Sequence, residues 1–590
     1  MIAPFRQAEN MIKIMKYFRK VDWLLLFLIL AFTILQVYCT MSLIDAIKDL
    51  TATIMSAQAS ASGEKDIWAG AGIMVGFAAG SMGCQIANAL FASTVSASLV
   101  TRLRKKLNDK VSGMSMSQIE SFSTSSLITR ATNDIQTVGF TFVMAARMLF
   151  SAPVTAVWAI CKIQAVSGEL TIVAGAGVVA LLAFLAFMFV FLMPRFKKTQ
   201  RLIDKVNLIT QENLSGIRVI RAYNAEDYQE SKFAQANEEL TKIQVFTSRM
   251  TALMNPVLML VMNAIALGIY WLGASLINQG STSYPTLVSF STLSSTIIMA
   301  FMMLMFMFIM IPRAQISASR VNEVFASESE IADPEVETSP KEKGTIEFDH
   351  VCFHYADAKE DVVSDLTFSV KKGETLAIIG ATGSGKSTII RLLARFYDPT
   401  SGSVKIDGVD VRELKEKTLR KILALVPQKG ILFSGTVESN IKFGDSSMSE
   451  ERMKEAARIA MADEFIEKME GGYQAKIARG GTNVSGGQRQ RLCIARAVAL
   501  LPEICAFDDS FSALDFKTDL AVRKNLAQAL GETTKVIVAQ RIGTIMDADQ
   551  ILVLSEGRIV GKGKHEELLR NCDTYREIAL SQLSEEELGL

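Results

Sequence analysis

Six stretches in the first 311 residues are apolar and long enough to cross a membrane. A helix needs about 20 predominantly apolar residues to span the hydrocarbon layer, where it satisfies its own backbone hydrogen bonds. The sequence therefore predicts six transmembrane helices, and this excludes soluble folds for that half of the chain. The expected spans are residues 22–44, 67–100, 140–166, 170–193, 253–277 and 284–311.

The connections between these spans differ in charge and in length. An even number of spans puts both ends of the domain on one side of the membrane. Lys and Arg gather before the first span and in the second and fourth connections. Because basic connections stay in the cytoplasm, we expect a multi-pass protein of the cell membrane with both termini in the cytoplasm. The second and fourth connections also show helical periodicity, which predicts helices that continue well beyond the lipid.

The charge balance bears on possible partners. The 62 Lys and Arg residues nearly equal the 61 Asp and Glu residues, and they are dispersed along the chain. Nucleic-acid binding requires a basic surface, so DNA and RNA are not expected partners. A hydrophobic content of 49% instead fits a chain that lies in a lipid bilayer. The seven cysteines are scattered without metal-ligand spacing, which predicts free thiols.

Beyond residue 325 the composition changes. Residues 326–344 are polar and contain Pro334 and Pro340, which predicts a linker between a membrane domain, residues 1–325, and a second domain, residues 345–590. In the second domain short β-rich runs alternate with helical segments, which predicts an α/β fold around a largely parallel sheet. The expected strands are residues 345–348, 374–379, 422–426, 504–507, 535–538 and 550–554.

A glycine-rich motif follows the second of these strands. Residues 380–388 read GATGSGKST, which matches G-x-x-x-x-G-K-S in its strand, loop and helix setting. Backbone N–H groups of such a loop close around phosphates, the lysine neutralises their charge, and the serine hydroxyl reaches Mg²⁺. We therefore expect ATP and Mg²⁺ as cofactors. The expected phosphate-loop residues are Gly380, Thr382, Gly383, Ser384, Gly385, Lys386, Ser387 and Thr388.

Two further motifs narrow the class. The apolar strand 504–507 ends in Asp508, a carboxylate that can hold Mg²⁺ beside the phosphate loop. A second glycine turn opens a helix before that strand, in the order Ser485, Gly486, Gly487 and Gln488. With this turn the chain resembles the ABC transporter family, and six spans fused ahead of the ATPase domain resemble a half-transporter of the ABC exporters.

The resemblance implies roles for further segments. It implies that Tyr355 stacks on adenine, that Gln428 contacts Mg²⁺, and that residues 512–515 form the D-loop. It also implies that residues 126–134 and 212–223 belong to intracellular extensions, whose short coupling helices press on the ATPase domains. The implied activity is an ATPase that couples hydrolysis to transport, with its ATP sites formed between two chains.

Two positions depart from the family pattern. The family's general base is a glutamate directly after the Mg²⁺ aspartate, whereas this chain has Asp509, and the switch histidine is replaced by Gln540. A shorter carboxylate should be a poor base, and glutamine cannot act as a protonated imidazole. The chain thus resembles the degenerate-site subunit of bacterial heterodimeric multidrug exporters, with a partner that supplies the glutamate and the histidine. Arg479, where many homodimers carry a glutamate, agrees with this interpretation. A slow homodimer is the alternative.

The transported compound is the least constrained feature. The last span carries Met299, Met303, Met307 and Met310, which we expect on one helical stripe. Flexible thioethers suit varied apolar ligands, although helix packing or lipid contact explains the stripe equally well. Arg147 in the third span either meets an anionic substrate or extends to the interface. By analogy we expect export of lipophilic small molecules or drugs. A peptide or lipid exporter, a regulatory ATP-binding subunit and siderophore import remain alternatives.

Overall fold

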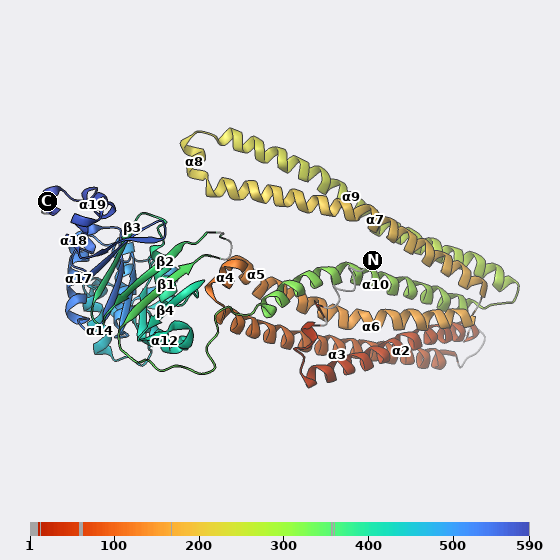
Figure 1. The fold of residues 1–590 in the computed structure, drawn as a ribbon. Helices are drawn as coiled ribbons and strands as arrows, with labels where there is room; N and C mark the ends of the chain where they lie inside the picture. The colour runs from red at the N-terminus through yellow and green to blue at the C-terminus, as the bar shows by residue number, and fades with distance from the viewer. Residues whose placement is uncertain are drawn as a thin grey trace. The chain divides into compact units, whose positions relative to one another are not determined.

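The computed structural model describes residues 10–11, 13–57, 63–166, 168–355, 358 and 360–588. The first nine residues of the predicted membrane domain and the last two of the predicted nucleotide-binding domain lie outside these ranges. The chain divides into two compact units (Figure 1). One, the helical unit, comprises Met1–Ser112 and Ser125–Ala326, and the other, the α/β unit, comprises Gly113–Thr124 and Ser327–Leu590.

The helical unit contains six long helices, each with an apolar section that can cross a membrane, which confirms the predicted number of spans. They exceed the roughly 20 residues that a bilayer requires, and α9 alone has 53 residues. The six are α2 (Lys20–Ala57), α3 (Gly63–Ser112), α6 (Ile135–Val166), α7 (Gly168–Ser215), α9 (Glu226–Asn278) and α10 (Tyr284–Ala326). Shorter elements are α5 (Thr124–Thr129), a π-helical turn (Arg130–Asp134) and α8 (Ile217–Ala222).

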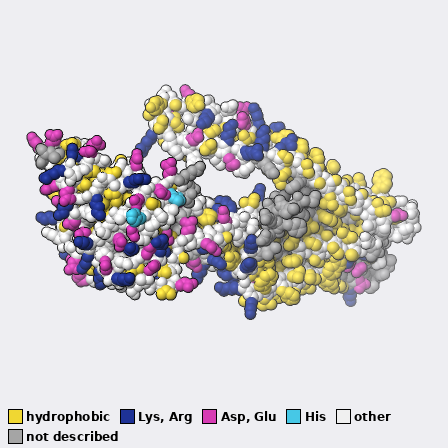
Figure 2. Space-filling model, in the orientation of Figure 1, with side chains coloured by type: hydrophobic (Ala, Val, Ile, Leu, Met, Phe, Trp, Pro, Cys, Tyr) yellow, Lys and Arg dark blue, Asp and Glu magenta, His cyan; other side chains and the backbone are white. Residues whose placement is uncertain are grey.

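The long helices form two groups within this unit. α2, α3, α6 and α10 pack together, whereas α7 and α9 lie side by side along most of their length (Figure 1). Near one end the groups share an apolar core that includes Leu170, Ile269 and Phe290. Figure 2 shows hydrophobic side chains over much of the four-helix group and the adjoining ends of α7 and α9, whereas charged side chains are frequent toward α8, and Trp271 is 80% exposed. Exposed apolar surface of this extent is expected where the neighbour is lipid.

The far end of the α7–α9 pair is different in character. There α8 joins the two helices, and none of its side chains is buried. Leu214, Val219 and Tyr223 are all exposed, Tyr223 at 81%. This tip of the helical unit therefore presents apolar side chains without a neighbour among the described residues of its own unit.

In the part of the chain that the structure describes, the α/β unit is built on a six-stranded and a four-stranded sheet, and a further small sheet has two strands. The largest sheet has the order β12-β11-β3-β10-β9-β6, in which β12 is antiparallel and the other five strands are parallel. Alternate residues of β3 face two different cores, with Leu376 and Ile378 in one and Ala377 and Ile379 in the other. Burial on both faces explains why these strands are continuous apolar runs. The strands of the six-stranded sheet are β3 (Thr375–Gly380), β6 (Leu423–Val426), β9 (Ile504–Asp508), β10 (Thr534–Val538), β11 (Gln550–Ser555) and β12 (Arg558–Gly563).

The four-stranded sheet corrects one sequence prediction. Residues 345–348 were expected in the parallel sheet, but β1 (Ile346–Phe353) pairs antiparallel with β2 (Val363–Val370) and β4 (Ser401–Ile406). The alternating burial of β1 is typical of an antiparallel strand with one buried face. β5 (Val409–Asp410) completes this sheet, and β7 (Gly435–Thr436) pairs with β8 (Lys476–Ile477).

Helices surround the two larger sheets. They are α11 (Lys386–Leu393), α12 (Glu416–Ile422), α13 (Val437–Ile441), α14 (Glu450–Ile459), α15 (Asp463–Lys468), α16 (Gly486–Val498), α17 (Phe516–Ala529), α18 (His565–Asn571), α19 (Asp573–Leu580) and α20 (Glu585–Leu588).

A short helix from early in the chain also belongs to the α/β unit. This helix, α4 (Met116–Phe122), begins with a capping box between Ser115 and Gln118. The Tyr397 hydroxyl donates a hydrogen bond of 2.9 Å to the Glu120 carboxylate. Ser117 donates a 2.7 Å bond to Glu330. Residues more than 200 positions apart in sequence are thus joined through polar side-chain contacts.

Candidate nucleotide site

The phosphate loop connects β3 to α11. Gly383 and Gly385 have positive φ angles of 85° and 97°, a conformation that costs little only for glycine. A Cβ on Gly385 would lie 2.6 Å from a methyl carbon of Val363, so a larger residue is also excluded by contact. No side chain caps the first turn of α11. The Thr388 N–H donates to the Gly385 carbonyl oxygen, which leaves the N–H groups of Lys386 and Ser387 to bind an anion.

Two side chains of this loop are buried in polar surroundings that a triphosphate would complete. The Lys386 ammonium donates to the carbonyl oxygens of Gly380, at 2.8 Å, and Ala381, at 2.7 Å. Burial lowers the pKa of Lys386, and the charges of Asp509 and Asp508 oppose that shift. The Ser384 hydroxyl is buried without a hydrogen-bond partner among the described residues. Phosphate oxygens would supply negative charge to the Lys386 ammonium and an acceptor to the Ser384 hydroxyl, so the loop fits ATP.

The Mg²⁺ position predicted beside the loop has a suitable set of oxygen atoms. Ser387 donates a 2.9 Å hydrogen bond to Asp508, which ends β9. Burial raises the pKa of Asp508, and the bond from Ser387 opposes that rise. Mg²⁺ prefers oxygen ligands and is usually bound by one or two carboxylates together with phosphates and water. The hydroxyl and carboxylate pair fits this ion.

Asp509 is held by two glutamine side chains. It has a positive φ of 47° and is nearly buried. Its Oδ2 accepts hydrogen bonds from Gln428, at 3.3 Å, and Gln540, at 3.0 Å. Gln428 follows β6 and Gln540 follows β10, so the ends of two strands meet at this carboxylate. The structure thus brings together the Q-loop residue, the expected base and the switch position.

Tyr355 lies over the start of α11, with its ring at an edge contact 5.3 Å from Tyr397. Its hydroxyl is 3.2 Å from the Thr388 hydroxyl and accepts a 2.9 Å bond from Arg391. Sequence reasoning did not identify Arg391 or Tyr397 as neighbours of the adenine-stacking position. Arg391 follows Thr388 by three residues, a helical spacing that could have suggested a shared face. Tyr397 carries no comparable signal.

The signature residues form a separate local structure. Ser485 caps α16, accepting a hydrogen bond from the Gln488 N–H, while Gln488 accepts one from the Ser485 N–H. Gly486 leaves open space where a Cβ would stand, and a Cβ on Gly487 would lie 3.3 Å from the Ala513 carbonyl oxygen. Both side-chain hydrogen bonds described for Ser485 and Gln488 lie within this capping box. Neither residue therefore has a described side-chain hydrogen bond to the phosphate loop of its own chain.

Two other predicted elements lie near the signature in sequence. In the D-loop, Asp515 caps α17 by accepting a hydrogen bond of 3.0 Å from the Thr518 N–H. Arg479 lies in the short turn before the signature, exposed to solvent. Neither residue has a described side-chain hydrogen bond to the phosphate loop.

Comparison with known proteins supports the two-part organisation. The family described as ABC transporter transmembrane region matches residues 23–301, and the family described as ABC transporter matches residues 363–512. An uncharacterized ABC transporter ATP-binding protein of Mycobacterium bovis is 37% identical over 515 residues, which cover 86% of this chain and 88% of that protein. A multidrug efflux ATP-binding/permease protein of Mycobacterium tuberculosis is 32% identical over 477 residues, or 78% of this chain and 38% of that protein.

Solved structures give the same fold. A bacterial Atm1-family ABC exporter with ATP bound superposes with a TM-score of 0.78 at 24% sequence identity, covering 93% of this chain and 97% of that one. A transmembrane region with six long helices among the described residues precedes an ATPase domain with a glycine-rich loop before α11, an aspartate at the end of β9 and a glycine turn at the start of α16. The chain therefore belongs to the ABC transporter family, as a half-transporter whose ATPase domain couples hydrolysis to transport.

Proposed function

We propose that this chain is one subunit of a heterodimeric exporter that moves lipophilic compounds out of the cytoplasm. In this proposal its own phosphate loop forms an ATP site that hydrolyses slowly, while its signature serves the competent site of a second half-transporter. The observation that supports this most strongly is the carboxylate of Asp509, held by Gln428 and Gln540.

Slow hydrolysis at this site is explained by the short side chain of Asp509 rather than by a low basicity of its carboxylate. Burial raises the pKa of Asp509, with the Gln428 bond opposing that rise, so the carboxylate is intrinsically no weaker a base than an ordinary aspartate. A base must nevertheless come within hydrogen-bond distance of the attacking water, and its contribution is about 10² to 10⁴ in rate. Aspartate ends about 1.5 Å short of glutamate, one carbon–carbon bond. In addition, one of its oxygens already accepts two amide hydrogen bonds.

The remaining residues of the site retain the groups needed to bind nucleotide. Lys386 and the N–H groups at the start of α11 hold the phosphates, and Tyr355 stacks on adenine. Ser387, Asp508 and Gln428 hold Mg²⁺, which when bound would neutralise charge on the β- and γ-phosphates. An intact cradle next to a poorly placed base describes a site that keeps ATP rather than one that turns it over.

The membrane half supports the direction and the cargo. The basic segments before α2 and around Arg102 and Arg201 favour a cytoplasmic α/β unit. The multidrug efflux relative favours lipophilic small molecules over peptides or lipids. Drug-stimulated ATPase in proteoliposomes supports this substrate class, whereas stimulation confined to peptides or to lipid scrambling replaces it with the corresponding alternative.

The test uses the complex co-purified with its natural partner and compares two variants. Asp509→Asn should leave most of the steady-state ATPase intact, because it removes a base that contributes little. Ser485→Arg should nearly abolish turnover, because the partner's ATP loses a γ-phosphate donor. Ser485→Thr keeps the hydroxyl and the helix cap and serves as the matched control. A loss of about 10² or more in Asp509→Asn would refute the degenerate-site assignment and favour the slow homodimer.

A further inference from the structure

A small, mainly apolar cavity with several polar side chains in its wall lies among α2, α3, α6 and α10 in the helical unit. Its volume is about 160 Å³. Gln36, Gln85, Asn88, Arg147 and Ser151 contribute polar groups to its wall, and Met144 and Met303 are among the apolar residues. Polar side chains within membrane helices are rare and usually face a functional cavity. The convergence of five of them from three helices is therefore a feature to be explained.

Apart from Asp22 and Lys162, which lie toward the ends of the predicted spans, Arg147 is the one charged residue in the apolar sections of the six long helices. Residues 23–44, 67–101, 135–161, 170–194, 250–278 and 284–312 contain no other Asp, Glu, Lys or Arg. Arg147 lies 19 residues before the end of α6, about 28 Å along the helix axis. That depth corresponds to the inner edge of a hydrocarbon layer about 30 Å thick. No described residue forms an ion pair or a side-chain hydrogen bond with its guanidinium group.

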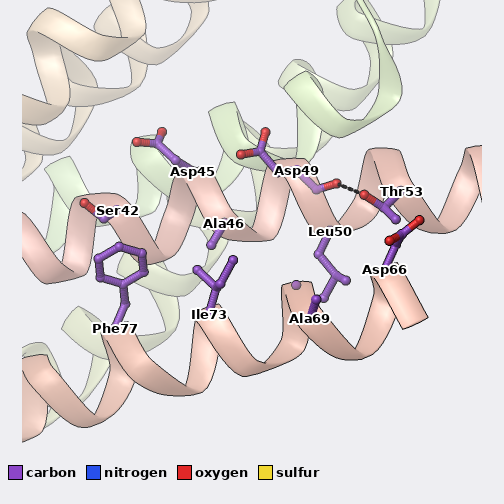
Figure 3. A pocket seen from close by; sticks show the side chains of 11 residues that line it. Ser42, Asp45, Ala46, Asp49, Leu50, Thr53, Asp66, Ala69, Ile73 and Phe77 are labelled. Atoms are coloured by element: carbon purple, nitrogen blue, oxygen red, sulfur yellow. Dashed lines mark hydrogen bonds between the residues drawn. The ribbon is translucent and has the colours of Figure 1, made fainter. Parts of the chain in front are cut away.

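The carboxylates described on the neighbouring helices do not pair with Arg147. Asp45, Asp49 and Asp66 line a separate cavity of about 410 Å³ between α2 and α3 (Figure 3). Asp45 is already paired with Lys162 of α6. It lies nine residues beyond Gln36, about 13 Å farther along α2. At the other end of the helices, Asp22 is paired with Arg102. The counter-charge for Arg147 must come from outside these acids.

Asn88 supplies a second unsatisfied group in the same wall. Its side chain is 96% buried, since only 4% of its surface is exposed. Its amide nitrogen donates to Thr33, at 3.2 Å, and to Gln36, at 3.4 Å, while its carbonyl oxygen is buried without a partner among the described residues. A buried acceptor left unpaired costs about 1 to 3 kcal/mol. A ligand that carries a hydrogen-bond donor beside an anionic group would satisfy both Asn88 and Arg147.

We propose that this cavity binds the head group of an amphipathic organic anion, a carboxylate with an adjacent N–H or O–H donor. Arg147 pairs with the carboxylate, Asn88 accepts from the donor, and the methionines contact the start of the apolar tail. This names the substrate class of the exporter proposed above and rests on that function. An arginine that only reaches for lipid head groups needs neither the buried acceptor nor the cavity.

The experiment measures binding directly, in the complex with its partner reconstituted in nanodiscs without ATP. The probe is N-lauroylglycine, whose amide N–H lies beside a carboxylate, and the matched ligands are its uncharged methyl ester and dodecyltrimethylammonium. The wild-type complex should bind the acid at least tenfold more tightly than either matched ligand. Arg147→Gln should lose that preference while Arg147→Lys retains most of it. Similar elution of all variants in size-exclusion chromatography confirms that they are folded.

Arg195→Gln is the control for a purely interfacial role. Arg195 lies near the inner end of the apolar part of α7, with its guanidinium carbon 3.8 Å from the centre of the Phe191 ring. If both arginines only anchor helices to head groups, the two variants should behave alike, and that result overturns the proposal. Unchanged binding of the acid by Arg147→Gln, or a preference for the cation, also overturns it. Binding as expected without ATP-driven transport of any compound would refute the export function and leave the site standing.

Discussion

Tyr397→Phe tests whether one hydrogen bond fixes α4 to the α/β unit. The substitution removes the hydroxyl that donates to Glu120 at 2.9 Å, while the ring keeps its contacts with Phe353 and Tyr355. Burial, followed by the bond to Glu120, raises the pKa of Tyr397, so the hydroxyl remains a donor throughout the physiological pH range. The acceptor is a carboxylate, but Glu120 is exposed, which puts the contribution near 1 kcal/mol.

That free energy corresponds to about a fivefold change in the equilibrium between docked and undocked α4, since 1.4 kcal/mol is a factor of ten. Hydrogen–deuterium exchange of residues 113–124 measures this equilibrium, because protection follows the free energy of local opening. We expect protection to fall about fivefold in the full complex, with exchange elsewhere in the α/β unit unchanged.

A double-mutant cycle provides the control. In a Glu120→Gln background the same Tyr397→Phe substitution should have a smaller effect, because the charged acceptor is already absent. Equal losses of protection in both backgrounds would show that the hydroxyl acts through something other than Glu120. Unchanged exchange in Tyr397→Phe would refute the reasoning altogether.

Three further predictions concern the α/β unit. Lys386→Ala should weaken ATP at this chain's phosphate loop by at least tenfold, as measured with a fluorescent ATP analogue, because it removes the charge that faces the phosphates; equal affinity contradicts the assignment. Gly385→Ala should destabilise the unit by at least about 1 kcal/mol, visible as a lower unfolding temperature, because φ is 97° and the added carbon meets Val363; an unchanged temperature contradicts it. Burial lowers the pKa of His565, so its neutral form stabilises the fold above roughly pH 6.5, the unfolded value, and that stability is lost as pH falls through the lowered pKa. The wild-type protein should therefore lose stability below pH 6.5 relative to His565→Asn, and a constant gap between them across pH 5 to 8 contradicts this.

Much of the fold could be predicted from local sequence pattern, and the predictions that failed did so for physical reasons. Continuous apolar runs predicted the parallel strands because both faces of that sheet are buried. β2 and β4 were not predicted, since their half-buried alternation is weak in isolation.

The methionines of α10 do not share one face: Met299 is 47% exposed and Met307 only 2%. A spacing of four residues advances about 40° per step on a helix of 3.6 residues per turn, so eight residues rotate the side chain by about 80°.

The site shows the same limit. The motif spacing predicted the phosphate loop and the aspartate that follows β9. The sequence also identified Gln428 as a motif position and identified Asp509 and Gln540 as departures from the family pattern. It could not show that both glutamines donate to one oxygen, because these contacts span 81 and 31 residues and depend on how strand ends meet. Side-chain bonds of that kind exist only after the sheet has formed.

The exposed tip at α8 has a consequence for how this protein is made. Leu214, Val219 and Tyr223 remain uncovered in the isolated chain, and transiently exposed apolar segments are the ones that chaperones and proteases recognise. In the proposed heterodimer, a subunit synthesised in excess of its partner would keep this tip exposed and would be degraded, so the amount of the scarcer subunit would set the amount of both. Matched synthesis of the two chains would then be a requirement for a stable transporter, imposed by three side chains at the end of a helical hairpin.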